Sequence, residues 1–208
     1  MARYTGPVCR LCRRHGDKLF LKGARCFTPK CAFERRPNPP GPRPARRRKV
    51  SDRGLQLREK QRARVTYGVL EKQFVRYYKE AIRRPGVSGE NLVRLLETRL
   101  DNVVYRLGFA DSRNQARQIV RHGIISVNDN KLDIPSAHMA EGDLIGFTAR
   151  GQRSEYYKIM QEVIRTRTTP TWLSLDAGAM TGRVTGAPSI ADAETKFNEN
   201  IIIEFYSR

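Results

Sequence analysis

The sequence predicts an α+β protein, with a mainly helical N-terminal domain followed by a module of two helices and a small antiparallel sheet. Apolar residues recur every three or four positions in several segments between residues 51 and 121, which is the period of an amphipathic helix. From residue 124 apolar and polar residues alternate around a polar turn, which is the period of a β-hairpin. All four cysteines lie within residues 9–31, which marks a separate N-terminal extension.

Charge is the strongest compositional feature. The 208 residues include 40 Lys and Arg against 21 Asp and Glu, a net charge of +19. Residues 1–90 hold 25 basic and 7 acidic side chains, so nearly all of the excess lies there. Such an excess indicates a polyanionic partner. Nucleic acid is favoured over its rival, an anionic membrane surface, because its phosphates release counterions when Lys and Arg replace them.

The chain lacks the roughly 20 consecutive apolar residues that span a bilayer. Its basic start also lacks the apolar region of a secretory signal. We therefore expect a cytoplasmic protein with no membrane partner, whose cysteines meet a reducing environment instead of forming structural disulfides.

A proline-rich arm precedes the first long helix. Five prolines within residues 37–44 deny a helix its hydrogen bonds, so residues 32–50 are expected to form an extended arm that orders on its partner. Ser51 or Asp52 then caps a helix that ends near Gly68.

The next helix, over residues 71–84, stops before Pro85 and carries aromatic residues at helical spacing. We expect these residues to be core, with stacking on nucleic-acid bases as the alternative. The aromatic residues are Phe74, Tyr77 and Tyr78, and Ile82 shares their spacing.

The module begins with one continuous helix predicted over residues 89–108, whose apolar stripe points to a buried face. A second helix starts at Ser112, in capping-box spacing with Gln115, and closes on Gly123. Its arginines lie four residues apart and predict an exposed stripe. They are Arg113, Arg117 and Arg121.

The rest of the chain predicts mainly β-structure and turns. A hairpin is expected around the turn Asn128-Asp129-Asn130, followed by a strand in residues 140–147. A helix is predicted over 154–167, then a turn-rich stretch over 168–189. The apolar, β-prone end of the chain is expected to dock as a strand over 198–208.

The four cysteines form a C-x₂-C pair and a C-x₄-C pair separated by thirteen residues. This spacing suits one structural, tetrahedral zinc ion held by Cys9, Cys12, Cys26 and Cys31. Such a site carries a net charge of −2, which Arg10, Arg13, Arg14 and Arg25 are expected to stabilise. The alternatives are His15 in place of one thiol, an iron–sulfur cluster, and free or disulfide-bonded cysteines. Catalytic zinc is disfavoured, because four cysteines leave no open position for water.

The segment "LLETRLDNVVYRLGFADSRNQARQIVRHG", followed by "VN", resembles the small RNA-binding module named after the fourth protein of the bacterial small ribosomal subunit. The likeness extends in order over the whole chain, through "RYTGPVCRLCRR", "LKGARC", "KCAFERRP", "LREKQRARVTYG", "PTWLSLD" and "IIIEFYSR". It is similar to the zinc-bearing branch of that ribosomal family, whose ligands fall on the four cysteines. The chain departs from the family at Ile124, where a histidine is usual, and at the turn Asn128-Asp129-Asn130, where Asn-Gly is usual.

The resemblance implies a structural, non-enzymatic protein of the small subunit. Such a protein is a primary binder of small-subunit rRNA that nucleates assembly of the ribonucleoprotein. It also contacts neighbouring ribosomal proteins, and mRNA where it enters the subunit, and so contributes to accurate translation. Recognition of rRNA is then mostly by shape and backbone, with no small-molecule substrate.

The predicted RNA-binding residues are the cations of the basic half together with those of the arginine stripe. They are Arg3, Arg10, Arg13, Arg14, Lys22, Arg35, Arg36, Arg43, Arg46, Arg47, Arg48, Lys49, Arg53, Arg58, Lys60, Arg62, Arg64, Arg113, Arg117, Arg121 and His122.

Four regions are predicted. Residues 1–45 form the zinc-binding, Pro- and Arg-rich extension, and residues 46–91 form a helical basic domain joined by the C-terminal strand. Residues 92–150 form the RNA-binding module, and residues 151–197 form a helical and turn-rich continuation of the second domain.

Two other classes of function fit the sequence less well. Pseudouridine synthases carry the same small module, and "RLD" at Arg99–Asp101 superficially matches their catalytic motif. Asp101, however, lies in an amphipathic helix near Glu97, so we interpret it as a structural ion-pair partner. A DNA-binding regulator fits the charge but explains neither the proline-rich basic arm nor the hairpin.

Overall fold

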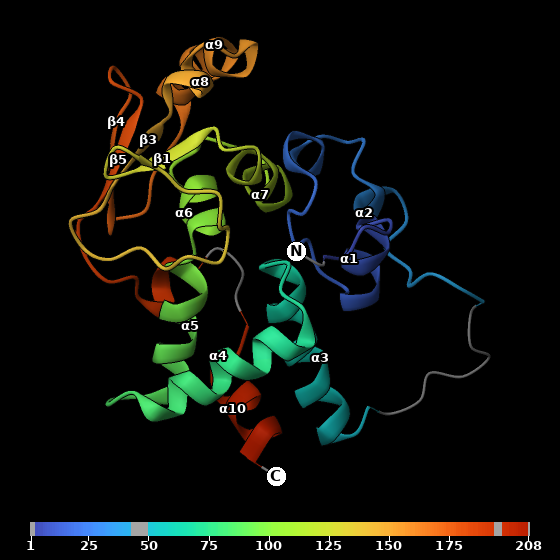
Figure 1. The fold of residues 1–208 in the computed structure, drawn as a ribbon. Coiled ribbons are helices and arrows are strands. Elements are labelled where there is room, and N and C mark those ends of the chain that lie inside the picture. Colours follow the sequence, from blue (N-terminus) through green and yellow to red (C-terminus); the bar gives the residue numbers. More distant parts are fainter. Residues whose placement is uncertain (1–2, 43–49, 194–196, 208) are drawn as a thin grey trace. The chain divides into compact units, whose positions relative to one another are not determined.

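The computed structural model describes residues 3–42, 50–193 and 197–207, and the chain divides into two compact units (Figure 1). The first unit comprises residues 1–92 and 194–208, and the second comprises residues 93–193. Residues 43–49 of the predicted arm lie outside the described residues. No helix in the described ranges is long and apolar enough to cross a membrane.

The first unit begins with three short helical elements that carry the cysteines. They are α1 (Cys9–His15), the 3₁₀ helix η1 (Gly23–Phe27) and α2 (Ala32–Arg35). Gly16 ends α1 with a left-handed backbone, φ +72°, which glycine adopts without steric cost. The small core beneath consists of Cys12, Leu19 and Leu21, packed against apolar residues that include Val65 of the next helix.

Two longer helices and the C-terminal helix complete the first unit. They are α3 (Asp52–Thr66), α4 (Glu71–Arg83) and α10 (Glu199–Ser207). The Ser51 hydroxyl caps α3 by accepting the N–H of Gly54 at 3.2 Å, and α4 ends before Pro85, both as predicted.

The aromatic residues of α4 are core, with one exception among the apolar positions. Phe74, Tyr77 and Tyr78 are buried as predicted, whereas Ile82, which shares their spacing, is 48 % exposed. The ring of Tyr206, on α10, lies 4.6 Å from that of Tyr78, and this pairing ties the end of the chain to α4.

The predicted C-terminal strand is wrong, because residues 199–207 form a helix that packs along α3. A strand needs a neighbouring edge for its hydrogen bonds, and the described part of the first unit contains no strand. A helix bonds its own backbone and still buries Ile202 completely. Tertiary packing therefore overrides the β-propensity of the isoleucines.

The helix predicted over residues 89–108 is broken into α5 (Ser88–Glu97), which runs across the boundary of the units, and α6 (Leu100–Arg106). Arg99 adopts an extended backbone and forms an isolated β-bridge with His138. The N–H of Leu100 then donates to the Ala137 carbonyl at 2.8 Å. A loop far along the chain thus supplies acceptors for the first turn of α6, which no local pattern indicates.

The helix α7 (Arg113–Arg121) follows and begins as predicted. The Ser112 hydroxyl accepts the N–H of Gln115 at 3.3 Å, and the Gln115 side chain accepts the N–H of Asp111 at 2.8 Å. Gly123, with φ +68°, closes the segment. This geometry fixes both the start of α7 and the direction in which the chain enters the sheet.

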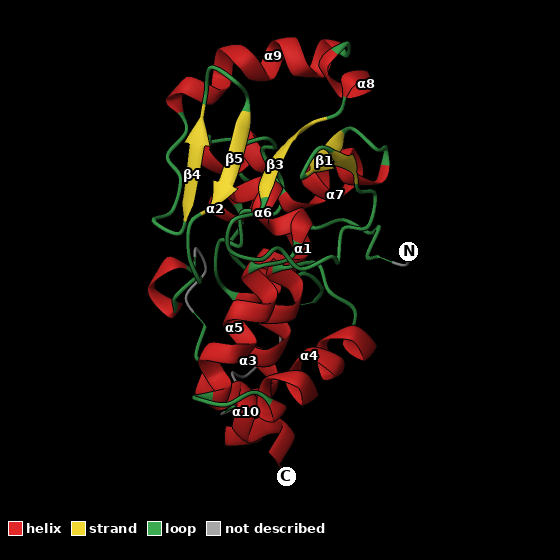
Figure 2. Ribbon diagram, turned by 60° about the vertical axis from the view of Figure 1, so that its left-hand side comes forward, coloured by secondary structure: helices red, strands yellow, loops and turns green. Residues whose placement is uncertain are grey.

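The sheet of the second unit is antiparallel, with the order β2-β1-β3-β5-β4 (Figure 2). The predicted hairpin is confirmed in β1 (Ile125–Val127) and β2 (Asn130–Lys131), and its turn places Asn128 and Asp129 at positive φ. The predicted following strand is β3 (Leu144–Phe147). The strands β4 (Leu173–Asp176) and β5 (Thr181–Val184) lie where only turns were expected.

The remaining helical elements of the second unit are α8 (Ala149–Gln152), α9 (Glu155–Val163), η2 (Ile164–Thr166) and η3 (Ile190–Asp192). The core forms where α6 and α7 pack against the sheet, with Met160 of α9 and Ile164 of η2 closing one end (Figure 2). The burial of Leu107, Phe109 and Ile145 in this core stabilises the unit independently of the cysteines.

Candidate nucleic-acid interface and cysteine cluster

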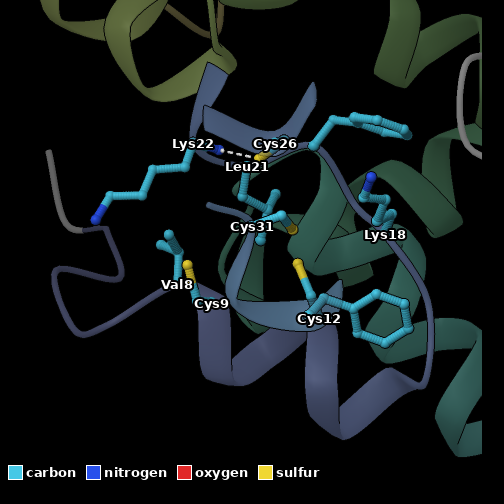
Figure 3. A pocket seen from close by; sticks show the side chains of 10 residues that line it. Val8, Cys9, Cys12, Lys18, Leu21, Lys22, Cys26 and Cys31 are labelled. Atoms are coloured by element: carbon cyan, nitrogen blue, oxygen red, sulfur yellow. Dashed lines mark hydrogen bonds between the residues drawn. The ribbon is translucent and has the colours of Figure 1, made fainter. Parts of the chain in front are cut away.

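The four cysteines line one small cavity, here called the thiol cavity, and Figure 3 shows their sulfur atoms facing the same space. Cys9 and Cys12 come from α1, Cys26 comes from η1, and Cys31 precedes α2. The cavity volume of about 10 Å³ corresponds to one water-sized sphere. The fold therefore brings together the four residues that the spacing singled out.

The thiols do not form a closed ligand set. Across the described ranges, no group of three or more His, Cys, Asp or Glu side chains is arranged so that it could hold a metal ion. Burial raises the pKa of the Cys12 thiol, the Leu19 backbone opposes the rise, and the neighbouring thiols add to it. The cysteines are thus close enough to influence one another electrostatically.

The four sulfur atoms are nevertheless donors of the kind that a thiophilic ion prefers. The backbone N–H of Lys22 donates to the Cys26 sulfur at 3.4 Å, a contact that favours the thiolate (Figure 3). Desolvation is the main cause of the raised pKa of Cys26, and a divalent cation would offset that cost.

The cations that line the thiol cavity are Lys18 and Lys22, not the arginines that were expected to stabilise the thiolates. Arg10 is exposed. Arg14 lines a different cavity, between α1 and α3, and Arg13 and Arg25 line a third, separate concavity. The reason is local, because side chains adjacent to a cysteine on a short turn leave the backbone in other directions.

That separate concavity is here called the basic pocket and has a volume of about 390 Å³. Arg13 of α1, Arg25 of η1 and the end of α2 contribute to it. Its lining residues are Arg13, Arg25, Lys30, Ala32, Arg35 and Arg36. Arg25 and Lys30 were missing from the predicted RNA-binding set, although each stands directly before a cysteine.

A larger cavity of about 580 Å³ lies between α1 and α3 and brings together Arg14, Arg58 and Arg64 of the predicted set. His15 lines the same cavity, not the thiol cavity, so this structure does not support it as a substitute ligand. Burial, followed by the charges of Arg62 and other nearby arginines, lowers the pKa of His15 to about 4. The arginines near this cavity therefore disfavour the protonated, positively charged form of His15.

Lys60, predicted to bind RNA, is buried and engaged within the protein. Its ammonium donates to a Glu71 carboxylate oxygen at 2.7 Å and lies 4.9 Å from the centre of the Phe205 ring. Burial alone would raise the pKa of Glu71, but hydrogen bonds from Lys60 and Tyr206 hold it below its usual value. Lys60 thus joins α3 to α4 and α10 instead of facing a partner.

The predicted exposed stripe on α7 is wrong for Arg113 and Arg117, which are only 9 % and 7 % exposed. Arg117 donates to an Asp101 carboxylate oxygen at 3.1 Å, and Arg113 donates to the Asn102 amide oxygen at 2.8 Å. Their long stems cover apolar core while their head groups reach buried acceptors on α6. Arg121 remains exposed.

Asp101 is a structural ion-pair partner, as predicted. Its carboxylate also accepts from Arg99 at 2.6 Å, while the buried Glu97 accepts from Arg106 at 3.1 Å. Two acids on adjacent helices therefore hold arginines within this unit, Asp101 pairing with Arg99 and Arg117 and Glu97 with Arg106.

The other predicted RNA-binding residues fall into three groups. Most are exposed: Arg3, Arg10, Arg14, Lys22, Arg35, Arg36, Arg53, Arg58, Arg121 and His122. The half-buried ones are Arg13, Arg62, which pairs with Asp17 and Glu59, and Arg64, which bonds to Gln61. Arg43, Arg46, Arg47, Arg48 and Lys49 lie outside the described residues.

Comparisons with known proteins match the whole length of the chain. Residues 3–97 match the family model "Ribosomal protein S4/S9 N-terminal domain", and residues 98–145 match the "S4 domain". The chain is 53 % identical to small ribosomal subunit protein uS4 of Heliobacterium modesticaldum and 52 % identical to that of Pelotomaculum thermopropionicum. It is 51 % identical to that of Dehalococcoides mccartyi. Each of these alignments covers 100 % of both chains.

Proposed function

The chain belongs to the uS4 family of small ribosomal subunit proteins, and on this premise we propose that the exposed cations of residues 3–42 and of α3 make it a primary binder of small-subunit rRNA. It is a structural protein of the small subunit, not an enzyme, and it binds rRNA and neighbouring ribosomal proteins. The finer proposals concern where the rRNA is bound, which metal the cysteines hold, and what the protein does after assembly.

The observation that carries the rRNA proposal is the uneven pairing of charge. In the first 51 residues there are two acids, Asp17 and Glu34, and each is paired with a cation, Arg62 and Lys18 respectively. Both carboxylates of this segment are therefore already paired, and the exposed arginines around them need anions from elsewhere. Phosphates of an RNA backbone supply the missing anions.

Binding of three ligands to the full chain tests this proposal. These are a small-subunit rRNA fragment, an unrelated folded RNA and duplex DNA of equal charge. We expect the rRNA to bind most tightly and to keep its advantage as salt is raised, because shape adds to charge. Equal affinity for all three would overturn the proposal. A preference for the DNA would favour a DNA-binding regulator.

We also propose that Cys9, Cys12, Cys26 and Cys31 hold one structural zinc ion. The common cavity, the four sulfur donors and the N–H of Lys22 on the Cys26 sulfur support it. When bound, zinc would link α1, η1 and the start of α2, which share only a small apolar core.

Metal analysis tests the zinc proposal. Protein purified without chelator should contain about one equivalent of zinc, and removal of the metal should release four titratable thiols. Cys26→Ser should speed hydrogen exchange in residues 9–35 and leave the second unit protected, because that unit has its own core. Full folding with no metal bound would overturn the proposal, and visible absorbance with bound iron would favour an iron–sulfur cluster.

Assembly and decoding are the last part of the proposal. Family membership supports early binding that nucleates the body of the subunit, contact with mRNA where it enters, and a contribution to translational accuracy. A crosslinking map of the assembled subunit tests the mRNA contact. Crosslinks to rRNA alone would remove mRNA from the partners.

A further inference from the structure

Among the described residues, the lining of the basic pocket holds five cationic side chains and no acid. The two acids of this part of the chain face elsewhere, since Asp17 pairs with Arg62 on α3 and Glu34 pairs with Lys18 at the thiol cavity. Cations held this close repel one another unless an anion lies among them. Because Asp17 and Glu34 pair elsewhere, we expect a binding partner to supply that anion.

Arg13 gives a second, independent indication of a ligand. Its Nε atom is buried and has no hydrogen-bond partner in the described ranges. A buried N–H without an acceptor is costly, so an acceptor supplied by a ligand, an ion or water would stabilise it. Arg25 lines the same pocket and is held by a hydrogen bond from its Nε to the Lys30 carbonyl at 3.1 Å.

The composition of the pocket identifies the ligand. Four of its five cations are arginines, whose planar guanidinium groups match the oxygens of a phosphate in pairs. Within the part of the chain that the structure describes, the lining contains no aromatic side chain on which a base could stack. The pocket is therefore suited to a backbone phosphate.

The same three segments build the basic pocket and the thiol cavity. Arg13 follows Cys12, Arg25 precedes Cys26, and Lys30 and Ala32 flank Cys31. Any shift of a cysteine therefore carries a pocket residue with it. The positions of the cysteines thus determine where the cations of the basic pocket lie.

We propose that the basic pocket binds a backbone phosphate of small-subunit rRNA and that the cysteine-bearing segments act as positioning residues for its five cations. This inference rests on the proposed function and assigns it a location. It separates the role of these arginines from that of Lys18 and Lys22, which line the thiol cavity.

Two triple variants of the full chain test the pocket, and both remove three positive charges. The pocket variant is Arg13→Gln/Arg25→Gln/Arg35→Gln, and the control is Arg76→Gln/Lys79→Gln/Arg83→Gln on the exposed face of α4. We expect the pocket variant to bind the rRNA fragment about tenfold more weakly, because its charged hydrogen bonds to the phosphate are removed. Its slope of log K against log salt should fall by about 0.7 to 0.9 for each phosphate that the variant no longer neutralises.

The control should lose about twofold or less in rRNA affinity. Equal losses in the two variants would overturn the phosphate pocket while leaving rRNA binding intact. Failure of the unmodified chain to prefer rRNA would overturn the proposed function and this inference with it. The conservative Arg13→Lys guards against misfolding, since it keeps the charge and removes the buried Nε–H. It should weaken rRNA binding at an unchanged melting temperature.

A double-variant cycle tests the positioning role. Cys26→Ser should weaken rRNA binding through the displaced pocket, so adding it to the pocket variant should cost little more. Additive losses would show that the cysteines act on rRNA binding independently of the pocket. NMR of the Arg13 Nε–H gives a direct reading, because addition of the rRNA fragment should shift and protect this proton. An unchanged signal in the bound protein would overturn the assignment.

Discussion

The two units use arginine in opposite ways. In the cysteine-bearing segment, residues 8–36, Arg10, Arg35 and Arg36 remain exposed around two acids that are already paired. In the second unit, Arg113 and Arg117 of α7 and Arg99, directly before α6, are buried and meet acceptors on α6, namely Asp101 and Asn102. Similar local densities of arginine therefore produce a charged surface in one unit and an internal network in the other.

Two local conditions account for the difference. A guanidinium enters a core only where a buried acceptor compensates for its lost hydration, and α6 supplies such acceptors in Asp101 and Asn102. It also needs apolar residues for its stem to cover, which the core of the second unit provides and the small core around Cys12 does not. The number of arginines alone does not predict how many are available to RNA.

The largest effect is expected from Asp101→Asn, which removes the carboxylate shared by Arg99 and Arg117. Breaking a buried pair leaves its cations uncompensated, so we expect a loss of about 3 to 5 kcal/mol in the free energy of unfolding. Urea titration measures it, with the exposed Asp133→Asn as control at about 0.5 kcal/mol or less. A stability equal to the control's would show that the network is not structural.

A matched pair on one helix sharpens the comparison. Arg117→Gln should cost about 1.5 to 3 kcal/mol, because it removes a charged hydrogen bond to Asp101. Arg121→Gln, one turn further and exposed, should change stability by about 0.5 kcal/mol or less. Thermal unfolding of both variants decides. Similar melting temperatures of the two variants would contradict the buried role of Arg117 and support the exposed stripe that the sequence predicted.

The density of charge in the first unit should appear as a pH effect. Burial and nearby arginines lower the pKa of His15 from 6.5 to about 4, so the folded state resists its protonation. The unfolded state takes up the proton first, so stability should fall as the pH falls from about 6.5 to about 4. His15→Gln should remove on the order of 1 to 3 kcal/mol of this dependence. Urea midpoints between pH 7.5 and pH 4.5 measure it, and parallel curves for the two proteins would contradict it.

The smallest effect on stability is expected where the arginines face solvent. Arg35→Gln and Arg36→Gln should each change the free energy of unfolding by about 0.5 kcal/mol or less, since each side chain is exposed. Their rRNA affinity should nevertheless fall with a reduced salt slope. A loss of stability comparable to that of Arg117→Gln would remove the contrast between the units.

Local signals in the sequence were sufficient for several element boundaries. The caps at Ser51 and Ser112 follow from one side chain and the N–H groups within its reach. The hairpin turn follows from Asn128 and Asp129, which tolerate positive φ. The spacing of the cysteines alone also identified the four cysteines that line the thiol cavity together.

Other features depended on partners distant in the sequence. The break at Arg99 depends on acceptors in residues 135–138, and α10 depends on the surface of α3. The strand β5 pairs with β3, and β4 pairs with β5, so both strands depend on a neighbouring edge that their short sequences do not reveal. Each of these required knowing what lies beside the segment.

The sequence by itself determined the family, the element types with local signals, the excess of positive charge and the set of cysteines that meet. These are properties of residue type and spacing. Only the tertiary structure decided which cations stay at the surface, because a guanidinium is drawn inward by an acceptor that arrives from another helix, as Asp101 does for Arg117. Only the tertiary structure separated the cations around the thiols from those of the basic pocket, because neighbouring residues on a short turn point in different directions.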